Sequence, residues 1–410
     1  MDHCFLSFAI CHFIGLLYFI DDVDNTREQN HQCIEHIRAD LLDKLAHLGP
    51  QETSDCIKQH LNRWETEEVR IAVAGQSATV KSTFINTFRG INEGQDGFVD
   101  VGFGDETEEI SEYKHPANKN IIFCDLPELS LKFSKLKFLE MVNLSDYSYI
   151  FIFFESVLTE GDQWLTIQIQ EKGIPFCLVR SKVDKDVESR KGIQIGEKGT
   201  LLKIRQKIKD SMSTNTAFTK AELFLISSEK PHIGEMSNLQ DHMKEKLPSK
   251  QFSAVMFSLP TLTERVIEKK LLELEPRMQY VSIGAAIISA VPISYMHIII
   301  NSALIKSEVR HYVKVFGLDQ THNENIEGLK NDFSVVSVDS FTQRKIIANY
   351  NACSSKRKAI LLSTVLFRKS LLGGHEIRLF VYTVLSDVLS ELQKDAITVY
   401  MHFLNKDHHR

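Results

Sequence analysis

The chain has 410 residues, which is too many for one compact core at about 100–200 residues per domain, so two or three folded units are expected. The hydrophobic fraction of 43% and the charged fraction of 25% are typical of globular proteins and exclude a disordered or fibrous chain. A net charge of −6 argues against a general nucleic-acid-binding protein, and no nucleic-acid partner is expected. The seven cysteines form no C-x-x-C pair, which favours a reducing cytosolic compartment.

The first apolar segment, Cys4–Ile20, carries no charged residue. Its length is at the short limit for a helix that crosses a membrane. A signal peptide would need a positively charged start and a cleavage site with small residues. Two alternatives stay open for this segment, a hydrophobic N-terminal anchor and a tail that docks on the protein.

A second apolar segment, Met278–Ile305, also lacks Asp, Glu, Lys and Arg and is long enough to span a membrane. Pro292 lies near its middle and should break or kink a helix there. We therefore favour two shorter helices that are buried in a helical domain over a membrane span.

The middle of the chain alternates short apolar runs with segments of helical spacing. The runs are rich in β-branched and aromatic residues, as in buried parallel strands, and lie at 69–74, 121–124, 149–154, 176–179 and 223–226. Stretches of helical spacing separate them, so the pattern predicts a mainly parallel sheet covered by helices on both faces.

The flanking segments are predicted to be helical. The predicted division is an apolar segment at 1–24, N-terminal helices at 25–64, an α/β domain at 65–250 and a C-terminal helical domain at 251–410. Within the last of these, Gly317 and the pair Gly373-Gly374 are expected to stop helices. An additional helix is expected at 326–336.

The loop after the first predicted strand resembles a P-loop, whose pattern is G-x-x-x-x-G-K-[ST]. Every fixed position matches except the second glycine, which is Val80. Backbone N–H groups of such a loop bind phosphate oxygens, a lysine neutralises the β- and γ-phosphates, and a hydroxyl binds Mg²⁺. The alternative is an ordinary strand-to-helix turn with an exposed lysine. The candidate nucleotide-binding residues here are Gly75, Gln76, Ser77, Ala78, Thr79, Val80, Lys81, Ser82 and Thr83.

Val80 is expected to weaken phosphate binding. A glycine at this point lets the backbone approach the phosphates, and a β-branched residue tolerates positive φ poorly. The alternative is that the valine side chain points away from the phosphates, in which case Lys81 and Ser82 would work normally.

Two further candidates for the Mg²⁺ and phosphate side are Asp125 and Thr107. Asp125 ends the second predicted strand, where a Walker-B aspartate holds Mg²⁺ through water, although an aspartate at a strand end is often only a helix cap. Thr107 lies in a glycine- and acid-rich stretch between the P-loop helix and Asp125. The alternative is that Thr107 is an ordinary loop residue that does not bind Mg²⁺. Ser82, Thr107 and Asp125 are the predicted Mg²⁺ ligands.

The candidate base-recognition residues follow the last two predicted strands. Ser181, Lys182 and Asp184 match [NT]-K-x-D with serine in first place. In this pattern the aspartate accepts from the N1–H and the 2-amino group of guanine, donors that adenine lacks. Ser227 follows the final strand, where a loop that touches guanine is expected.

The residues that hydrolysis of the nucleotide requires are less complete than those that bind it. Guanine-nucleotide hydrolases carry glycine three residues after the strand-end aspartate, and this chain has Glu128 there. No glutamine follows Asp125 to orient a water and no arginine finger can be chosen, so no catalytic residue is assigned.

Taken together, these motifs resemble the immunity-related, interferon-inducible GTPases of about 47 kDa. The resemblance also covers runs without a nucleotide role, such as Ser258-Leu259-Pro260 and Val315-Phe316-Gly317-Leu318-Asp319. It implies a Ras-like P-loop GTPase domain inserted between N- and C-terminal helices that pack together as an all-α domain. It also implies slow, assembly-linked hydrolysis of GTP with Mg²⁺ as cofactor.

The same resemblance implies self-association through the nucleotide face. It implies a cytoplasmic protein that associates with the endoplasmic reticulum, Golgi or vacuole membranes, in cell-autonomous innate defence against intracellular pathogens. The alternative is a degenerate member that acts as a membrane-associated regulatory or binding protein without efficient hydrolysis.

A basic and apolar segment near the C-terminus is the candidate membrane contact. Basic residues flank the apolar run 359–367, as in a helix that lies on an anionic lipid surface. The alternative is a core helix with a solvated basic end. The residues expected to meet lipid are Lys356, Arg357, Lys358, Arg368 and Lys369.

Overall fold

The structure is a computed structural model that describes residues 28–75, 78–100, 109–127, 134–154, 157–189, 196–212, 217–290, 296–319, 337–358, 361 and 371–407. The chain divides into two compact units. Residues 64–266 form an α/β unit, and residues on either side of it form a helical unit.

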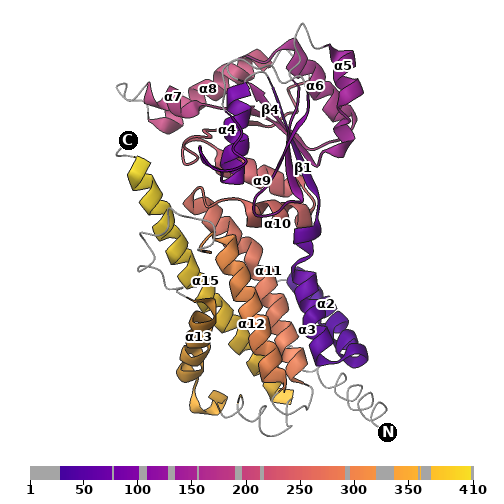
Figure 1. Ribbon diagram of the computed structural model, residues 1–410, viewed down its shortest axis with the longest axis vertical. Helices are drawn as coiled ribbons and strands as arrows, with labels where there is room; N and C mark the ends of the chain where they lie inside the picture. The colour runs from indigo at the N-terminus through magenta and orange to yellow at the C-terminus, as the bar shows by residue number, and fades with distance from the viewer. Residues whose placement is uncertain are drawn as a thin grey trace. The chain divides into compact units, whose positions relative to one another are not determined.

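The α/β unit is built on a six-stranded sheet of order β2-β3-β1-β4-β5-β6 (Figure 1). All neighbouring pairs are parallel except β2 and β3. The strands are β1 (Val69–Gly75), β2 (Ser111–Lys114), β3 (Ile121–Asp125), β4 (Tyr149–Phe154), β5 (Phe176–Arg180) and β6 (Leu223–Leu225). The predicted α/β fold with a mainly parallel sheet is confirmed, and each of the five predicted runs is a strand.

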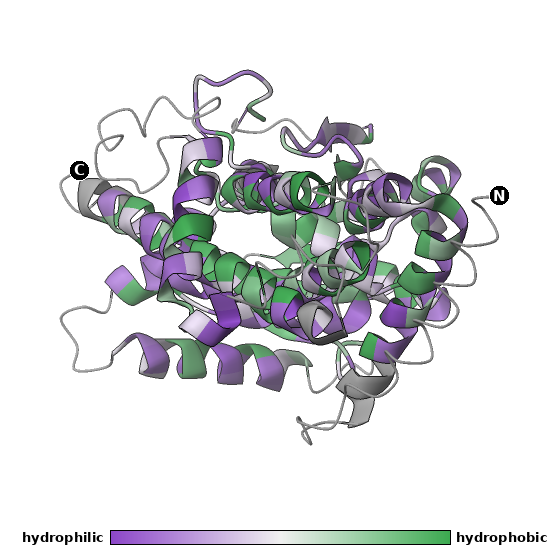
Figure 2. Ribbon diagram, turned by 90° about the horizontal axis from the view of Figure 1, so that it is seen from below, coloured by the Kyte–Doolittle hydropathy of each residue, from purple (hydrophilic) through white to green (hydrophobic). Residues whose placement is uncertain are grey.

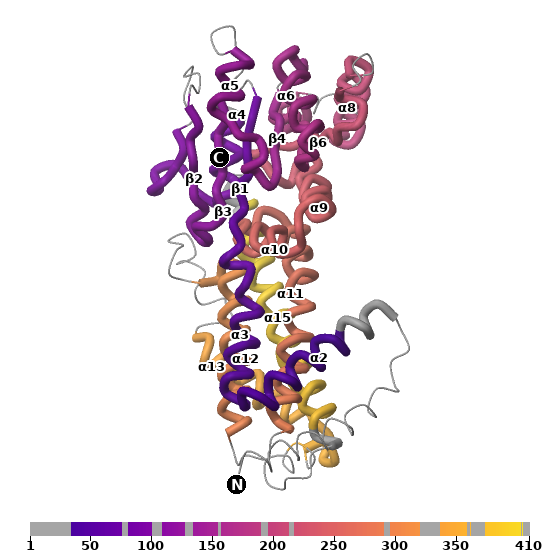
Figure 3. The backbone as a smooth tube through the Cα atoms, turned by 90° about the vertical axis from the view of Figure 1, so that its right-hand side faces the viewer, coloured from indigo at the N-terminus to yellow at the C-terminus, as the bar shows by residue number. Residues whose placement is uncertain are grey.

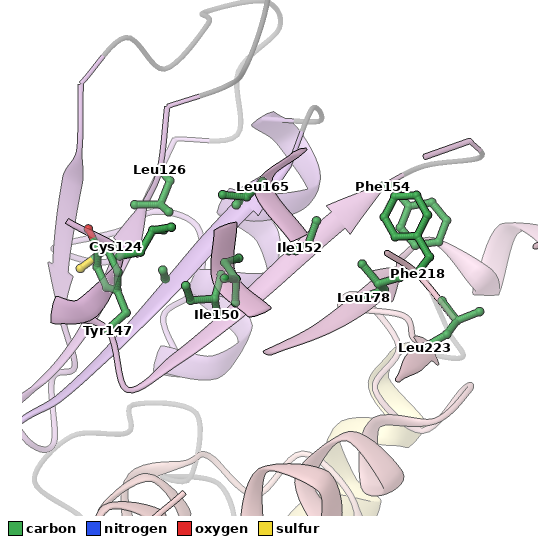
Figure 4. Packing of buried hydrophobic residues seen from close by; sticks show 14 of the residues in the cluster. Cys124, Leu126, Tyr147, Ile150, Ile152, Phe154, Leu165, Leu178, Phe218 and Leu223 are labelled. Carbon is green, nitrogen blue, oxygen red and sulfur yellow. The ribbon is translucent and has the colours of Figure 1, made fainter. Parts of the chain in front are cut away.

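The helical elements of this unit are α4 (Ala78–Arg89), α5 (Lys135–Met141), α6 (Glu160–Glu171), α7 (Val183–Glu188), α8 (Glu197–Met212), α9 (Met236–Lys246) and α10 (Ser249–Ser258), with short 3₁₀ turns at Arg63–Thr66 and Leu144–Asp146. Alternate residues of β4 face opposite layers. Ile150 and Ile152 pack in a core with residues of α5, α6 and α8 (Figure 4). On the other side, Phe151 and Phe153 contact the ring of Phe84 in α4.

The helical unit combines both ends of the chain. Its helices are α2 (Glu28–Leu48), α3 (Pro50–Leu61), α11 (Glu264–Ser289), α12 (Met296–Val315), α13 (Val338–Ala352) and α15 (Leu371–Asp407), and the start of α11 belongs to the α/β unit. The N-terminal helix α3 packs on α12 (Figure 3). Figure 2 shows hydrophobic and hydrophilic residues on the same helices, as expected where a helix buries one side.

Two expectations about helices can be compared with the structure. The segment 278–305 forms two helices, α11 and α12, and no described helix is both long and apolar enough to cross a membrane. The helix stop predicted at Gly373-Gly374 is wrong, because α15 continues through both glycines. Glycine costs a helix only about 1 kcal/mol, which the packing of a 37-residue helix outweighs. The predicted segments 1–24 and 326–336 lie outside the described residues.

Candidate nucleotide-binding site

Gly75 closes β1 with a backbone that only glycine accepts. Its φ is +126°, and a Cβ at this position would lie 1.9 Å from the carbonyl oxygen of Phe153 in β4. A side chain would therefore push the end of β1 away from the sheet. The first glycine of the predicted P-loop is thus fixed by the close approach of two neighbouring strands.

Lys81 and Asp125 meet at the carboxyl ends of β1 and β3. The Nζ of Lys81 lies 3.1 Å from Oδ1 of Asp125 and donates to the carbonyl oxygen of Leu126 at 3.2 Å. Both side chains are buried. Burial raises the pKa of Asp125, and the charge of Lys81 and its contact with the carboxylate partly offset that rise. The structure therefore brings together the predicted phosphate lysine and the predicted Walker-B aspartate.

The described residues at the carboxyl ends of β1 and β3 fit a Mg²⁺ ion. Oδ1 of Asp125 is buried and makes no well-aligned hydrogen bond, its contact with Lys81 being an ion pair, while Ser82 is buried next to Lys81. No group of three or more His, Cys, Asp or Glu side chains gathers in the described parts. The buried carboxylate of Asp125 and the neighbouring hydroxyl of Ser82 suit Mg²⁺, which usually takes one or two protein oxygens together with water and substrate phosphates.

The other predicted P-loop residues are only partly described. Gln76, Ser77 and Thr107 lie outside the described residues, as does Glu128. Ala78, Thr79 and Val80 form the first residues of α4, and their side chains are not described. Among described residues other than glycine, positive φ occurs only at Lys182, so Val80 is not strained in that way. The expectation that Val80 weakens phosphate binding stays a prediction that rests on side-chain crowding alone.

The predicted base-recognition residues follow β5 at the same edge of the sheet. Ser181 and Asp184 are buried, and Lys182, directly before α7, adopts a left-handed conformation with φ of 59°. Such a backbone costs about 1–3 kcal/mol in a residue other than glycine, and it is typical of functional sites. The N–H of Val183 donates to the carbonyl oxygen of Ile226 at 3.3 Å. The loop after β5 is thereby held against the loop after β6.

Ser227 is fully buried in that second loop. Its hydroxyl oxygen accepts from the N–H of Lys230 at 2.9 Å. The side chain of Lys230 in turn pairs with Glu188 of α7. These contacts join the predicted loop of Ser227 to the helix that carries Asp184.

Thr87 links the two ends of the site, a role that the sequence did not reveal. Its hydroxyl is 2.9 Å from the carbonyl oxygen of Thr83 in its own helix and 2.9 Å from that of Ser228. Thr87 therefore connects α4, which carries Lys81, to the loop of Ser227. Nothing in the sequence around Thr87 distinguishes it from an ordinary helical threonine, because its partner lies 141 residues further along the chain.

Residues 40–391 match the Interferon-inducible GTPase (IIGP) family, which is most of the chain. The chain belongs to this family. The match includes both ends of the site described above and the helices on each side of the α/β unit, so the predicted resemblance is confirmed. Membership implies a P-loop GTPase fold and nucleotide binding, and it accounts for the order of Lys81, Asp125 and Asp184 along the chain.

Curated relatives from the family align over much of the chain. Interferon-inducible GTPase 1 of Mus musculus is 27% identical over 289 residues, which is 70% of this chain and 69% of the relative. Interferon-inducible GTPase 5 of Rattus norvegicus is 24% identical over 374 residues, 87% of this chain and 80% of the relative.

Among solved structures, Era in complex with MgGDPNP and nucleotides of 16S ribosomal RNA is 17% identical and covers 54% of this chain and 67% of its own, with a TM-score of 0.31.

The candidate membrane residues belong to the helical unit and lie apart from the nucleotide motifs in sequence. Lys356 is exposed. Arg357 pairs with Glu376 at 2.6 Å, and Nζ of Lys358 donates to the carbonyl oxygen of Asn351 at 2.8 Å. Arg368, Lys369 and most of the apolar run between them and Lys358 lie outside the described residues. Arg357 therefore joins the segment after α13 to α15, and Lys358 joins that segment to the end of α13.

Proposed function

We propose that this protein is a GTPase that binds GTP and GDP with Mg²⁺ and hydrolyses GTP slowly, in step with self-assembly through its nucleotide face. It acts at intracellular membranes in cell-autonomous defence against pathogens. The observation that carries the nucleotide part is the convergence of Lys81, Asp125, Ser181 and Asp184 at the carboxyl edge of one parallel sheet. Ligands of open α/β sheets bind at this edge.

Different residues would contact the phosphates, the Mg²⁺ ion and the base of the nucleotide. Lys81 would neutralise phosphate charge, and Ser82, Asp125 and Thr107 would hold Mg²⁺, which supplies charge neutralisation of the phosphates when bound. Asp184 would accept from guanine, while Ser181, Lys182 and Ser227 shape the base site. The remaining P-loop residues, from Gly75 to Thr83, would supply backbone donors.

Asp184→Asn tests guanine recognition. The variant should lose tenfold or more in affinity for GTP and GDP, because an amide offers a donor where the base also donates. Tolerance for xanthine nucleotides should rise. Titration of purified protein with GTP, GDP, XTP and ATP measures both effects.

Asp186→Asn is the matched control, because Asp186 lies on the same helix and pairs with Arg180 at 2.9 Å. It should leave the affinity for GTP within twofold. Equal competition by ATP and GTP in the unchanged protein would contradict guanine recognition.

A degenerate, non-hydrolysing regulator is the second candidate, and the substitutions Val80 and Glu128 on the phosphate side favour it. Phosphate release from GTP, measured over a range of protein concentrations, separates the two. Assembly-linked hydrolysis gives a specific rate that rises with protein concentration. A rate that stays at the background of GTP alone would favour the regulator.

Membrane association is proposed through the segment 356–372. Reversing the charges of Lys356, Arg357 and Lys358 to glutamate should reduce flotation with anionic vesicles tenfold or more, because each basic residue near the surface contributes about 1 kcal/mol. Since Arg357 pairs with Glu376, the single variant Lys356→Glu is a second test that leaves that pair intact.

The control for this experiment reverses Lys203, Lys207 and Lys209, which are exposed on α8 of the other unit. It changes net charge equally and should leave flotation unchanged. Equal flotation of the two triple variants would remove the segment 356–372 from the membrane contact.

A further inference from the structure

Three large apolar side chains are exposed within four residues at the start of α12. Met296, Ile298 and Ile299 expose 47%, 42% and 70% of their surface. Exposed large aliphatic residues occur singly elsewhere in the described helical unit, at positions such as Leu272 of α11. Single exposed residues are ordinary, whereas a cluster marks a contact with something apolar.

Contacts between helices place this cluster at one end of the helical unit. Arg277 of α11 pairs with Glu308 of α12, and the amide of Asn301 in α12 donates to the carbonyl oxygen of Ala285 at 3.1 Å, so the two helices run antiparallel. The start of α12 therefore lies beside the end of α11.

The turn between α2 and α3 lies at the same end. Arg277 contacts the carbonyl oxygen of Leu61 at the end of α3, while a Cβ on Gly284 would touch Ile57, so α3 runs antiparallel to α11. The start of α3 thus points to the end of α11. Leu48, which is exposed, comes directly before this turn. We call Leu48, Met296, Ile298 and Ile299 the apolar tip.

The start of α12 is uncharged, which suits contact with a lipid surface. No charged residue occurs between Arg277 and Lys306, so α12 brings no charge to the tip. The start of α15 lies toward the same end (Figure 1), and Arg357, the neighbour of the exposed Lys356 in sequence, pairs with Glu376 near that start. Asp43 and Glu52 flank Leu48, which centres the apolar contact on α12. An uncharged apolar surface with basic residues nearby suits a membrane that carries anionic lipids.

We propose that the apolar tip inserts into the head-group region of an anionic membrane, with Met296, Ile298 and Ile299 as its main contact. This inference rests on the membrane association proposed above and adds an apolar contact to its basic one. A second copy of the chain is the competing occupant, and the experiment distinguishes the two.

Flotation of the full chain with vesicles of phosphatidylcholine, with and without phosphatidylserine, tests the proposal. The double variant Ile298→Glu and Ile299→Glu should bind both kinds of vesicle at least tenfold more weakly. Leu272→Glu is the matched control, because Leu272 is exposed on the same unit but lies 12 residues before Gly284, away from the tip. It should change binding by less than twofold.

Each result is decisive. Unchanged flotation of the double variant overturns the proposed insertion of the apolar tip. If the charge reversal at 356–358 still abolishes binding, the proposed membrane association stands without the tip. A change from dimer to monomer in sedimentation, with unchanged flotation, assigns the tip to a second copy and overturns the proposal. Unchanged affinity for GDP in the double variant shows that the α/β unit has folded, and unchanged hydrogen exchange of the amides in α11 and α12 shows the same for the helical unit.

Discussion

Glu308→Ala is expected to lower the free energy of unfolding of the helical unit by about 3–5 kcal/mol, because it leaves a buried charge unpaired. Nε and Nη2 of Arg277 donate to the two carboxylate oxygens of Glu308 at 2.7 Å and 2.8 Å. Nη1 of the same arginine donates to the carbonyl oxygen of Leu61. One guanidinium group thereby joins α11, α12 and the end of α3.

The surroundings make the loss of this carboxylate costly. Burial, with Arg277, Lys314 and Lys270 nearby, holds the pKa of His311 well below its ordinary range, so this neighbour is neutral. Burial also lowers the pKa of Lys270, to about 7. The region disfavours positive charge, and Glu308 is the carboxylate that pairs with Arg277.

Hydrogen exchange of the amides in α11 and α12 measures this effect within the helical unit. Exchange in Glu308→Ala should be faster by about two to four orders of magnitude. Arg310→Ala is the control, because Arg310 pairs with Asp339 on the surface, where such pairs contribute about 0–1 kcal/mol. The double variant Arg277→Met and Glu308→Leu should regain much of the stability, since it leaves no charge unpaired. Equal exchange in Glu308→Ala and Arg310→Ala would show that the pair does not clamp these helices.

The strands that the sequence revealed are those buried on both faces. Tyr149–Phe154 is apolar at every position and therefore stands out. β2 was missed because Ser111–Lys114 is polar and half exposed at the edge of the sheet. Its strand conformation comes from antiparallel pairing with β3, a long-range effect that a local pattern does not record.

The candidate site likewise combines residues with a local sequence pattern and residues whose role depends on long-range packing. Lys81, Asp125 and Asp184 were predicted because each follows a recognisable strand and has a motif around it. Thr87 was not, because its contact with Ser228 depends on how α4 packs on the sheet. The left-handed backbone of Lys182 was equally hidden, since lysine carries no preference for that conformation.

The second large effect is expected for Lys81→Met, which should weaken binding of GTP and GDP at least about a hundredfold. Lys81 would make charge-assisted contacts with two phosphates, each contributing about 1.5–3 kcal/mol. Affinity for GMP, which lacks those phosphates, should change by less than threefold. Competition binding with the three nucleotides measures the difference, and Lys114→Met, on an exposed lysine of β2, is the control.

The same variant should also change how stability depends on pH. Burial raises the pKa of Asp125 and Lys81 opposes that rise, so loss of Lys81 raises the pKa further. The folded state then holds the Asp125 proton more strongly than the unfolded state does. Stability must therefore fall as pH rises from the ordinary aspartate range to the raised pKa of the folded state. We expect a steeper fall in Lys81→Met than in the unchanged protein.

Asp125→Asn separates this electrostatic effect from a general loss of structure. In the double variant Lys81→Met and Asp125→Asn no carboxylate is left to titrate at this position, so the extra dependence on pH should disappear while nucleotide affinity stays low. Denaturation followed by the fluorescence of Trp64 and Trp164 reports on the α/β unit, where both tryptophans lie. If the single and double variants show the same dependence on pH, Lys81 does not stabilise the charge of Asp125. If Lys81→Met binds GTP as tightly as the unchanged protein does, phosphate is held by other groups.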